Sequence, residues 1–488
     1  MKSLPEIFLP LVLGTLLLTT TASAADRPNI LWIITEDMSP HFGCYGEKSI
    51  ATPNVDRLAA EGTRFSRAHV TAPICSTSRS ALITGMYQTS VGAQHHRSGR
   101  GTVKIALPAG VVPVPQLFKD AGYWTCNGAW PAKGKGLAKT DYNFEWDSKI
   151  YDGNDWAARA PGQPFFAQIQ LNGGKVRDGN NAAQTFQQQL GSLTKPDDLP
   201  LPPYYPRTPA MLEDWALTLD ACRLADQQVG EIRARLAKEG ILDQTVIIFI
   251  TDHGVSHARG KQYLYKEGTH IPFIVRGPGV GAGQVREDLI EHIDMAATSL
   301  AWAGIARPKT MQARDIFAKD YAPRDAIFAA RDRADETVDH IRSVRTGRWL
   351  YIRNYLPQRP HLQPNDYKDN KRCYVALRAA QAEGKLDAVQ QQLFAPTRPA
   401  EELYDTQADP WEIRNLAADP QHATTLAELR GKQDRWIEET NDLGHQPEPA
   451  AQYESDMAAY IGEGKKAGRI GEVERNIALM KKWAAEGK

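Results

Sequence analysis

The sequence predicts an α/β fold: a large, mainly parallel sheet flanked by helices, followed by a smaller C-terminal α+β subdomain. Short apolar runs alternate with helical patterns along the first two thirds of the chain, an order typical of a parallel sheet covered on both faces. After about residue 324 the pattern changes to short strands, such as 326–330 and 348–355. We expect a large domain over residues 25–323, a smaller subdomain over 324–420 and a charged helical tail over 421–488.

The first strand–loop–helix unit begins with the apolar run 28–34, which ends at the acidic pair Glu36 and Asp37. Thr52 and Pro53 then predict a helix start, with a capping residue followed by proline in the first turn. Sites in parallel sheets gather beyond the carboxyl ends of the strands. The two acids therefore lie where a functional loop is expected.

Two further units follow. They comprise a strand over 65–71 and a helix over 78–84 around Cys75, then a helix over 211–239 and a strand over 245–251 that ends at Asp252 and His253. Between these units, residues 172–209 are rich in Gly, Asn, Gln and Pro, which predicts a long irregular loop of the kind that often forms a binding edge.

The first 24 residues have the layout of a cleavable secretory signal: Lys2, an apolar run over 7–18 and the small-residue triplet 22–24. A retained membrane anchor is the alternative for this segment. No later stretch has the length of apolar sequence that a membrane span needs. We therefore expect export, to the periplasm or as a secreted protein, with no membrane span after signal cleavage.

The charge balance and the cysteine content limit the binding partners and the disulfides that the sequence allows. The 58 basic and 58 acidic residues balance, so nothing indicates nucleic-acid binding through an overall positive field. The five cysteines are an odd number for an exported protein. If Cys75 is consumed chemically, the other four allow up to two disulfides, and free thiols are equally open.

The segment Cys75-Ser76-Thr77-Ser78-Arg79, with Thr84-Gly85 downstream, carries the strongest signal. In isolation it would indicate a buried cysteine beside a helix start. It resembles the signature of the sulfatase family, C-x-P-S-R with a later T-G, although Thr77 replaces the usual proline. The resemblance implies that a formylglycine-generating or anaerobic maturation enzyme converts Cys75 to formylglycine, whose hydrate supplies an oxygen nucleophile, and that Arg79 steadies this group. A helix start also favours an anionic sulfate.

The same resemblance implies a metal site. Glu36 and Asp37 match the family's paired acids, and Asp252 and His253 match a second pair after a later strand. Together with position 75 they would bind one hard cation, calcium, because carboxylate oxygens suit it. Glu36 and the histidine depart from the family's two aspartates and asparagine. Adjacent acids in a solvated loop are the alternative.

Three lysines match or adjoin family blocks. Lys261, in the stretch GKQYLYKEG, resembles the family's sulfate-binding lysine, which neutralises an oxyanion. Lys139 matches the lysine of a G-K-x-H block whose histidine is missing here. Lys175 follows a glycine pair and either replaces a second missing histidine or is simply exposed.

Histidines are further candidates for protonating the leaving group, because histidine titrates near neutrality. His257 follows the predicted metal pair by one turn, and His95 and His96 follow the signature helix. A structural or surface role is the alternative for each.

The resemblance covers most of residues 27–418 and implies hydrolysis of a sulfate ester or a sulfamate, with a sulfated carbohydrate as the expected substrate. The segments 331–337 and 341–354 are similar to those of heparan N-sulfatases. Arg331, Arg333 and Arg342 would bind flanking sulfates, or else form ion pairs with neighbouring acids. Two other functions stay open: a phosphodiesterase or phosphonate monoester hydrolase of the same alkaline-phosphatase-like superfamily, and a non-catalytic glycan-binding protein if Cys75 is not modified.

Overall fold

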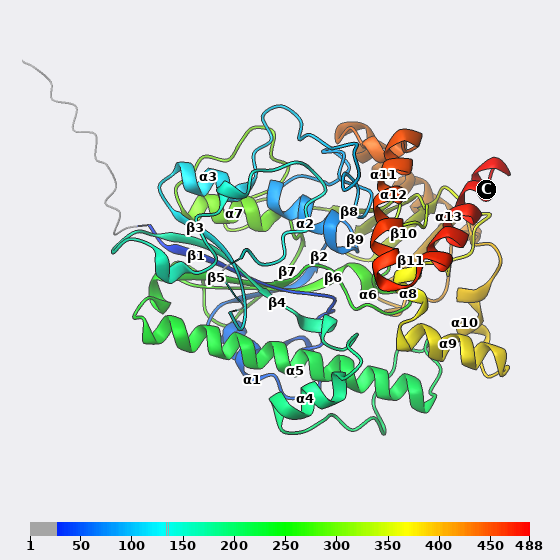
Figure 1. The fold of residues 1–488 in the computed structure, drawn as a ribbon, viewed down its shortest axis with the longest axis horizontal. Helices are drawn as coiled ribbons and strands as arrows, with labels where there is room; N and C mark the ends of the chain where they lie inside the picture. The colour runs from blue at the N-terminus through cyan, green and yellow to red at the C-terminus, as the bar shows by residue number, and fades with distance from the viewer. Residues whose placement is uncertain (1–26, 133, 135) are drawn as a thin grey trace, which may run out of the picture.

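A computed structural model describes residues 27–132, 134 and 136–488, so the predicted secretory signal lies outside the described residues. The large sheet has the strand order β3-β4-β1-β5-β6-β2-β7 (Figure 1). Its strands are β1 (Asn29–Thr35), β2 (Thr63–His69), β3 (Trp124–Ala129), β4 (Phe165–Leu171), β5 (Thr245–Thr251), β6 (His270–Arg276) and β7 (Gln284–Glu291). Only β6 runs antiparallel to its neighbours among these seven, which confirms the predicted mainly parallel sheet.

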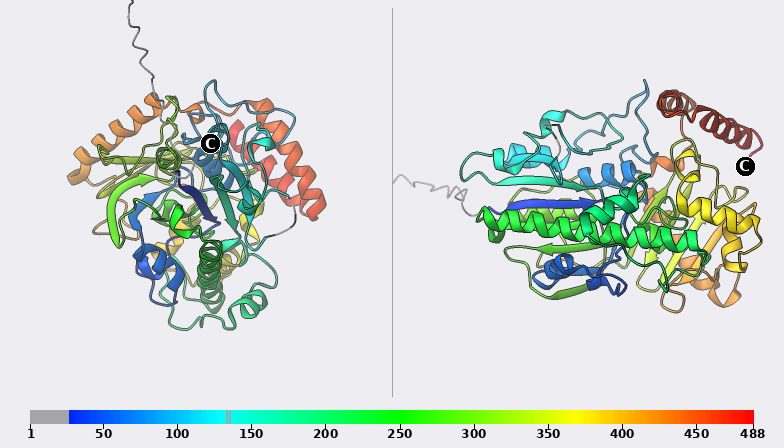
Figure 2. Two further views of the ribbon diagram at one scale, coloured as in Figure 1. Left: turned by 90° about the vertical axis from the view of Figure 1, so that its left-hand side faces the viewer. Right: turned by 60° about the horizontal axis from the view of Figure 1, so that its bottom comes forward.

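Helices cover both faces of this sheet. They are α1 (Pro53–Ala60), α2 (Cys75–Thr84), α3 (Val114–Asp120), α4 (Ala182–Leu190), α5 (Pro209–Lys238), α6 (Lys266–Thr269) and α7 (Asp294–Trp302). Side chains of β1 alternate between the two faces, so Trp32 packs in one core with α2, α3 and α7, while Leu31 packs in another with α1 and α5. The long helix α5 lies along one face of the sheet (Figure 1 and the right-hand view of Figure 2).

The smaller sheet lies beyond the carboxyl edge of the large one (Figure 1). Its antiparallel strands are β8 (Ala326–Arg331), β9 (Ile341–Thr346), β10 (Trp349–Asn354) and β11 (Glu401–Asp405). The helices of this part are α8 (Asp366–Asp369), α9 (Arg372–Ala382), α10 (Ala388–Gln391), α11 (Ala423–Glu439), α12 (Ala450–Ala467) and α13 (Ile470–Ala485). The predicted C-terminal α+β part is therefore present, and the domain boundaries near 324 and 421 stay predictions.

Residues 172–209 are more regular than predicted. They contain the 3₁₀ turn Gly173–Lys175 and the helix α4, which is nine residues long. Ala182 and Phe186 are one turn apart on α4 and are buried against Leu217 and Ala221 of α5. Only these two positions of α4 are buried, and mostly polar residues surround them. The sequence therefore gives only a weak signal of helical periodicity here.

The cap predicted for α1 is also different. The Thr52 hydroxyl accepts no helix N–H and instead accepts a hydrogen bond from the Gly43 N–H at 2.8 Å. The N–H groups of Asn54 and Val55 donate to the Asp226 carboxylate of α5, at 2.9 and 2.7 Å. A residue distant in sequence thus caps the helix.

All five cysteines are free thiols, so the disulfide possibility is not realised. Across the described residues, we find no helix whose length and apolar character would let it span a bilayer.

Candidate active site

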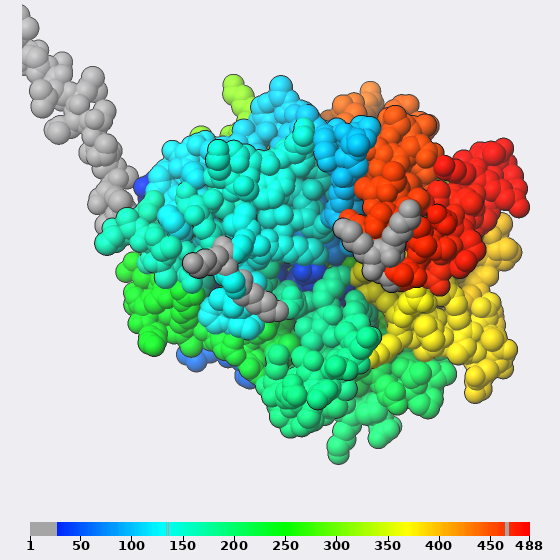
Figure 3. Space-filling model, in the orientation of Figure 1, coloured from blue at the N-terminus to red at the C-terminus, as the bar shows by residue number. Residues whose placement is uncertain are grey.

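Three adjacent strands end together and carry the candidate residues to one place. Thr35, the last residue of β1, pairs with Leu171 of β4 on one side and with Thr251 of β5 on the other. The loops that follow these strand ends start at positions 36, 172 and 252. Figure 3 shows a hollow in which blue, N-terminal atoms form the floor between the cyan segment and the C-terminal helices.

Cys75 is the first residue of α2 and is only 3% exposed. The Lys261 ammonium donates to its sulfur at 3.0 Å, His253 Nε2 lies 3.2 Å from that sulfur and Asp37 Oδ1 lies 3.8 Å from it. The first N–H groups of a helix have no partner within the helix. The thiol therefore lies at a helix terminus suited to an anion.

The loop after β1 is strained and tightly packed. Asp37 has a φ of 56°, in the left-handed region that non-glycine residues adopt uncommonly. The Gly174 N–H donates to the Glu36 carbonyl at 2.7 Å, and a Cβ on Gly173 would lie 2.3 Å from the Thr35 hydroxyl oxygen. The glycine pair is therefore required for the close approach of the two loops.

Four side chains could share one cation. One ligand atom from each of Asp37, Cys75, Asp252 and His253 lies within 4.8 Å of the other three. His253 Nδ1 is 2.8 Å from the Gly254 carbonyl, a partner that fixes Nδ1 as the donor and turns Nε2 toward Asp37 Oδ1, 3.0 Å away. Burial alone would lower the pKa of His253, but Asp252, Cys75 and Asp37 raise it to about 10. A buried group of four potential ligands, two of them carboxylates, fits a metal ion.

Glu36 is not part of that group. Its Oε2 accepts a hydrogen bond from Lys139 at 2.6 Å, and its Oε1 lies 3.9 Å from Arg79. Arg79 is buried and donates to Asp252 Oδ2 at 3.1 Å and to Gln170 Oε1 at 2.8 Å. The structure thus places Glu36 beside two cations and Arg79 beside a predicted metal ligand.

The three predicted lysines converge on the same centre. Lys175 Nζ lies 2.7 Å from Asp37 Oδ2, and Lys261 Nζ lies 3.1 Å from Asp37 Oδ1. Burial raises the pKa of the Cys75 thiol, but Lys139, Lys261 and Lys175 outweigh it and lower the pKa to about 7. A positive pocket therefore surrounds Cys75, and it favours a thiolate or a bound oxyanion.

Tyr367 also reaches this centre, although no motif marks it. Its hydroxyl lies 3.1 Å from Lys261 Nζ, 3.0 Å from Lys371 Nζ and 3.3 Å from Asp37 Oδ2, and it accepts a hydrogen bond from Lys175. It comes from α8, which is 106 positions away from Lys261 in the chain. Only the tertiary fold brings these residues together, so local sequence patterns hold no signal for it.

The histidine candidates lie elsewhere. His257 Nε2 is 2.8 Å from Asp214, and its ring nitrogens are 2.9 and 3.0 Å from the Arg177 guanidinium. Burial and Arg177 lower the pKa of His257 to about 4, although Asp214 opposes them, so the ring is neutral. His96 Nδ1 lies 2.7 Å from the Ser76 hydroxyl, and His95 accepts from a backbone N–H at 3.3 Å. None of these histidines contacts Cys75.

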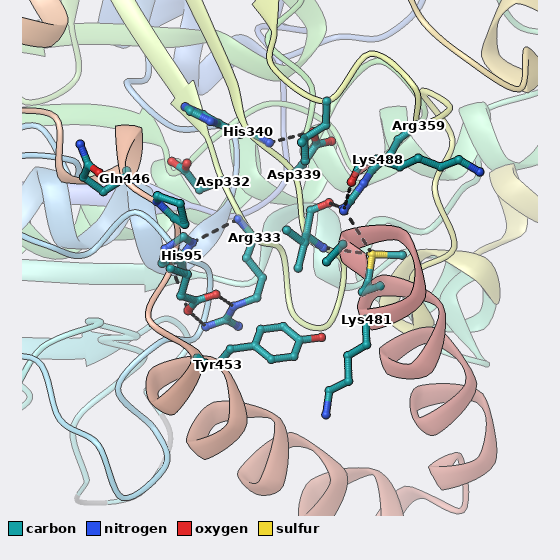
Figure 4. Close-up of a pocket in the computed structure, with 18 of the residues that line it drawn as sticks. His95, Asp332, Arg333, Asp339, His340, Arg359, Gln446, Tyr453, Lys481 and Lys488 are labelled. Atoms are coloured by element: carbon teal, nitrogen blue, oxygen red, sulfur yellow. Dashed lines mark hydrogen bonds and ion pairs between the residues drawn. The ribbon is translucent and has the colours of Figure 1, made fainter. Parts of the chain in front are cut away.

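The three arginines proposed to bind flanking sulfates are buried and paired. Arg342 bridges Asp442 and Asp332, Arg333 bridges Glu448 and Asp456, and Arg331 pairs with Asp339. Arg333 lines a cavity of about 490 Å³ between α12, α13 and the loops of the small sheet, but its guanidinium points to Glu448 (Figure 4). Of the two interpretations, the structure supports the ion pairs, and these are buried rather than on the surface.

Comparisons with known proteins show which family this chain belongs to. The family model described as Sulfatase matches residues 28–305, and that of the N-sulphoglucosamine sulphohydrolase C-terminal region matches residues 253–362. An ulvan-active sulfatase of Formosa agariphila is 32% identical, over 88% of this chain and 78% of the relative. The N-sulphoglucosamine sulphohydrolase of Homo sapiens is 27% identical, over 88% of this chain and 93% of the relative.

Solved structures share the fold. A protein whose structure was solved in complex with its substrate D-glucosamine-2-N,6-O-disulfate superposes with a TM-score of 0.60 at 19% identity, covering 85% of this chain and 98% of that one. At this identity the likeness concerns the fold alone.

Proposed function

Because the chain belongs to the sulfatase family, whose members hydrolyse sulfuric esters, we propose that it removes sulfate from a sulfated carbohydrate at a centre built on Cys75. The observation that carries the proposal is the position of Cys75. Its sulfur is buried at the start of α2, in contact both with a lysine ammonium and with side chains suited to a metal ion.

The nucleophile proposed is formylglycine, made from Cys75 by a maturation enzyme. This group supplies a hydrated aldehyde oxygen for attack on sulfur, and covalent catalysis then divides one difficult displacement into two easier ones. Thr77 takes the place of the family's usual proline at the third position of α2, where its hydroxyl donates to the Ile74 carbonyl at 2.9 Å. The helix start is thus formed without proline.

The cation proposed is calcium, held by Asp37, Asp252, His253 and the side chain at position 75. Two buried carboxylates give the hard oxygen donors that calcium prefers, and the histidine nitrogen is the exception in the set. Calcium would supply positive charge beside the sulfate oxygens. Glu36 supports the site indirectly, through its hydrogen bond from Lys139.

The chain's own cations bind the sulfate. Lys139, Lys175 and Lys261 lower the pKa of the Cys75 thiol, and the same field stabilises sulfuryl oxygens and the charge that develops on the leaving oxygen. Arg79 is fixed by Asp252 and Gln170, so its guanidinium can orient position 75 without moving. Since no other histidine contacts Cys75 within the described residues, a lysine is the proposed proton donor to the leaving group.

A sulfated carbohydrate is the proposed substrate class, because one relative is named for ulvan and another for N-sulphoglucosamine. Export to the periplasm or the exterior, proposed from residues 1–24, would bring the protein to extracellular polysaccharides. The proposed class includes both O-sulfates and N-sulfates.

The test is a parallel assay of the exported, mature protein. Release of inorganic sulfate is measured with ulvan and heparan oligosaccharides and with 4-nitrophenyl sulfate, beside 4-nitrophenyl phosphate and a phosphonate monoester. The proposal predicts sulfate release well above any phosphorus ester hydrolysis. Faster hydrolysis of the phosphonate would support a phosphonate monoester hydrolase instead, and binding of the saccharides without turnover would support a glycan-binding protein.

A further inference from the structure

Tyr367 places one hydroxyl oxygen among three lysine ammonium groups beside Cys75. The oxygen is 3.1 Å from Lys261 Nζ and 3.0 Å from Lys371 Nζ, and it accepts a shorter hydrogen bond from Lys175. The same three nitrogens lie 4.5, 4.2 and 4.8 Å from the centre of the tyrosine ring. Ring and hydroxyl thus contact three like charges, of which Lys175 and Lys261 also pair with Asp37 and Lys371 with Asp178.

The hydroxyl cannot satisfy all of these partners at once. It has one proton and two acceptor lone pairs. The proton is directed to Asp37 Oδ2, 3.3 Å away, so only two of the three lysines can donate to the oxygen at full strength. The three ammonium groups therefore share two acceptor positions on this oxygen, so one of them can turn to another acceptor and leave both positions filled.

Burial and the remaining contacts identify that ammonium group. Lys371 is fixed by Asp178 at 2.5 Å and by the Ser256 hydroxyl at 2.9 Å. The Lys261 side chain is 3% exposed, whereas that of Lys175 is 26% exposed. Lys175 also pairs with Asp37 Oδ2 at 2.7 Å, but as the most exposed of the three lysines it is the ammonium group that an arriving substrate can reach.

We propose that Tyr367 is a positioning residue of this site. Its hydroxyl holds Lys175 and Lys261 on one side of Cys75 and releases Lys175 to a sulfuryl oxygen when the sulfate group binds. Holding both ammonium groups beside position 75 before the substrate arrives limits the movement that Lys175 must make to reach the sulfuryl group, and smaller reorganisation favours stabilisation of the transition state. The inference rests on the proposed sulfatase function and concerns the oxyanion pocket of that site.

Tyr367→Phe is the direct test, because it keeps the ring and deletes the oxygen. For a sulfate ester that the wild-type protein hydrolyses, we expect kcat to fall about 10- to 100-fold, while formylglycine content, calcium content and Tm stay unchanged. Lys371→Met, which removes the fixed neighbour of the hydroxyl, is expected to act in the same direction and more weakly. Tyr351→Phe is the matched control, since its buried hydroxyl bonds Glu401 in the small sheet, at 2.6 Å, and should leave kcat unchanged.

A second measurement does not depend on turnover. Binding of inorganic sulfate is measured by calorimetry in a Cys75→Ala background, with and without Tyr367→Phe. We expect the affinity for sulfate to fall about tenfold when the hydroxyl is removed, because Lys175 and Lys261 are then held together by Asp37 alone and are less well oriented before sulfate binds.

The outcomes separate this inference from the proposed function. If the wild-type protein hydrolyses a sulfate ester and Tyr367→Phe has the same kcat and the same affinity for sulfate, the role of Tyr367 is overturned and the proposed function stands. Loss of calcium from Tyr367→Phe would also overturn it, because the hydroxyl would then serve Asp37. A converted wild-type protein that hydrolyses no sulfate ester would refute the proposed function, while the calorimetry would still decide the role of Tyr367.

Discussion

Replacing Lys261 by methionine tests the proposed oxyanion pocket. Methionine keeps an unbranched apolar side chain and deletes the ammonium group, which lies 3.0 Å from the Cys75 sulfur and is 3% exposed. Two unit charges about 4 Å apart in an effective dielectric of ~20 attract by about 4 kcal/mol. That energy corresponds to about a thousandfold in rate. Because Lys139 and Lys175 remain, we expect kcat/KM to fall by about 10²- to 10³-fold.

The assay is steady-state kinetics on the best sulfate ester found, at equal formylglycine content in each variant. Lys266→Met is the matched control, because Lys266 follows in the same segment and its side chain is exposed. If Lys261→Met kept more than about a tenth of the wild-type kcat/KM, the assignment of Lys261 to the bound sulfate would be refuted.

Three further predictions concern the core, the metal and the thiol. Arg342→Met leaves Asp442 buried without its partner, so the free energy of unfolding measured in urea should fall by about 3–5 kcal/mol. A loss of kcat/KM that is larger for an oligosaccharide than for an aryl sulfate would contradict this structural role. Chelation should abolish activity and calcium restore it, whereas Asp37→Asn should resist rescue; full activity of protein shown to be metal-free by elemental analysis would falsify this. In calcium-free protein with unconverted Cys75, the rate of thiol alkylation by iodoacetamide should rise with pH and reach its midpoint near the thiol pKa of about 7. Lys139→Met should move this midpoint to higher pH. A wild-type midpoint at the usual pKa of a thiol would exclude the effect of the lysines.

The strand ends were predictable because their signals are local. An apolar run followed at once by polar ligands predicted both Asp37 and Asp252, and the parallel pairing of β1 with β5 brings these two loops side by side. The sequence left Lys175 open between a site role and exposure. Its position follows from the glycine pair before it, whose close packing against the β1 loop directs the next residue to Asp37.

Other features depend on contacts between distant segments. Tyr367 reaches the site from α8, and Arg342 is neutralised by Asp442, 100 positions away. His257 follows a predicted metal ligand by one turn, yet its ring contacts Arg177 and Asp214 instead of Cys75. Proximity in sequence placed His257 in the correct loop but did not predict the direction of its side chain. That direction is set by contact with Asp214 of α5.

The measurement that tests the central claim most directly is the mass of the peptide that contains residues 75–79 in the exported protein, recorded together with sulfate release by the same preparation. We predict that Cys75 carries formylglycine, that sulfate release scales with the converted fraction across preparations, and that Cys75→Ala folds but releases none. Sulfate release by protein in which every Cys75 is an unmodified thiol, or undiminished release by Cys75→Ala, would contradict this prediction.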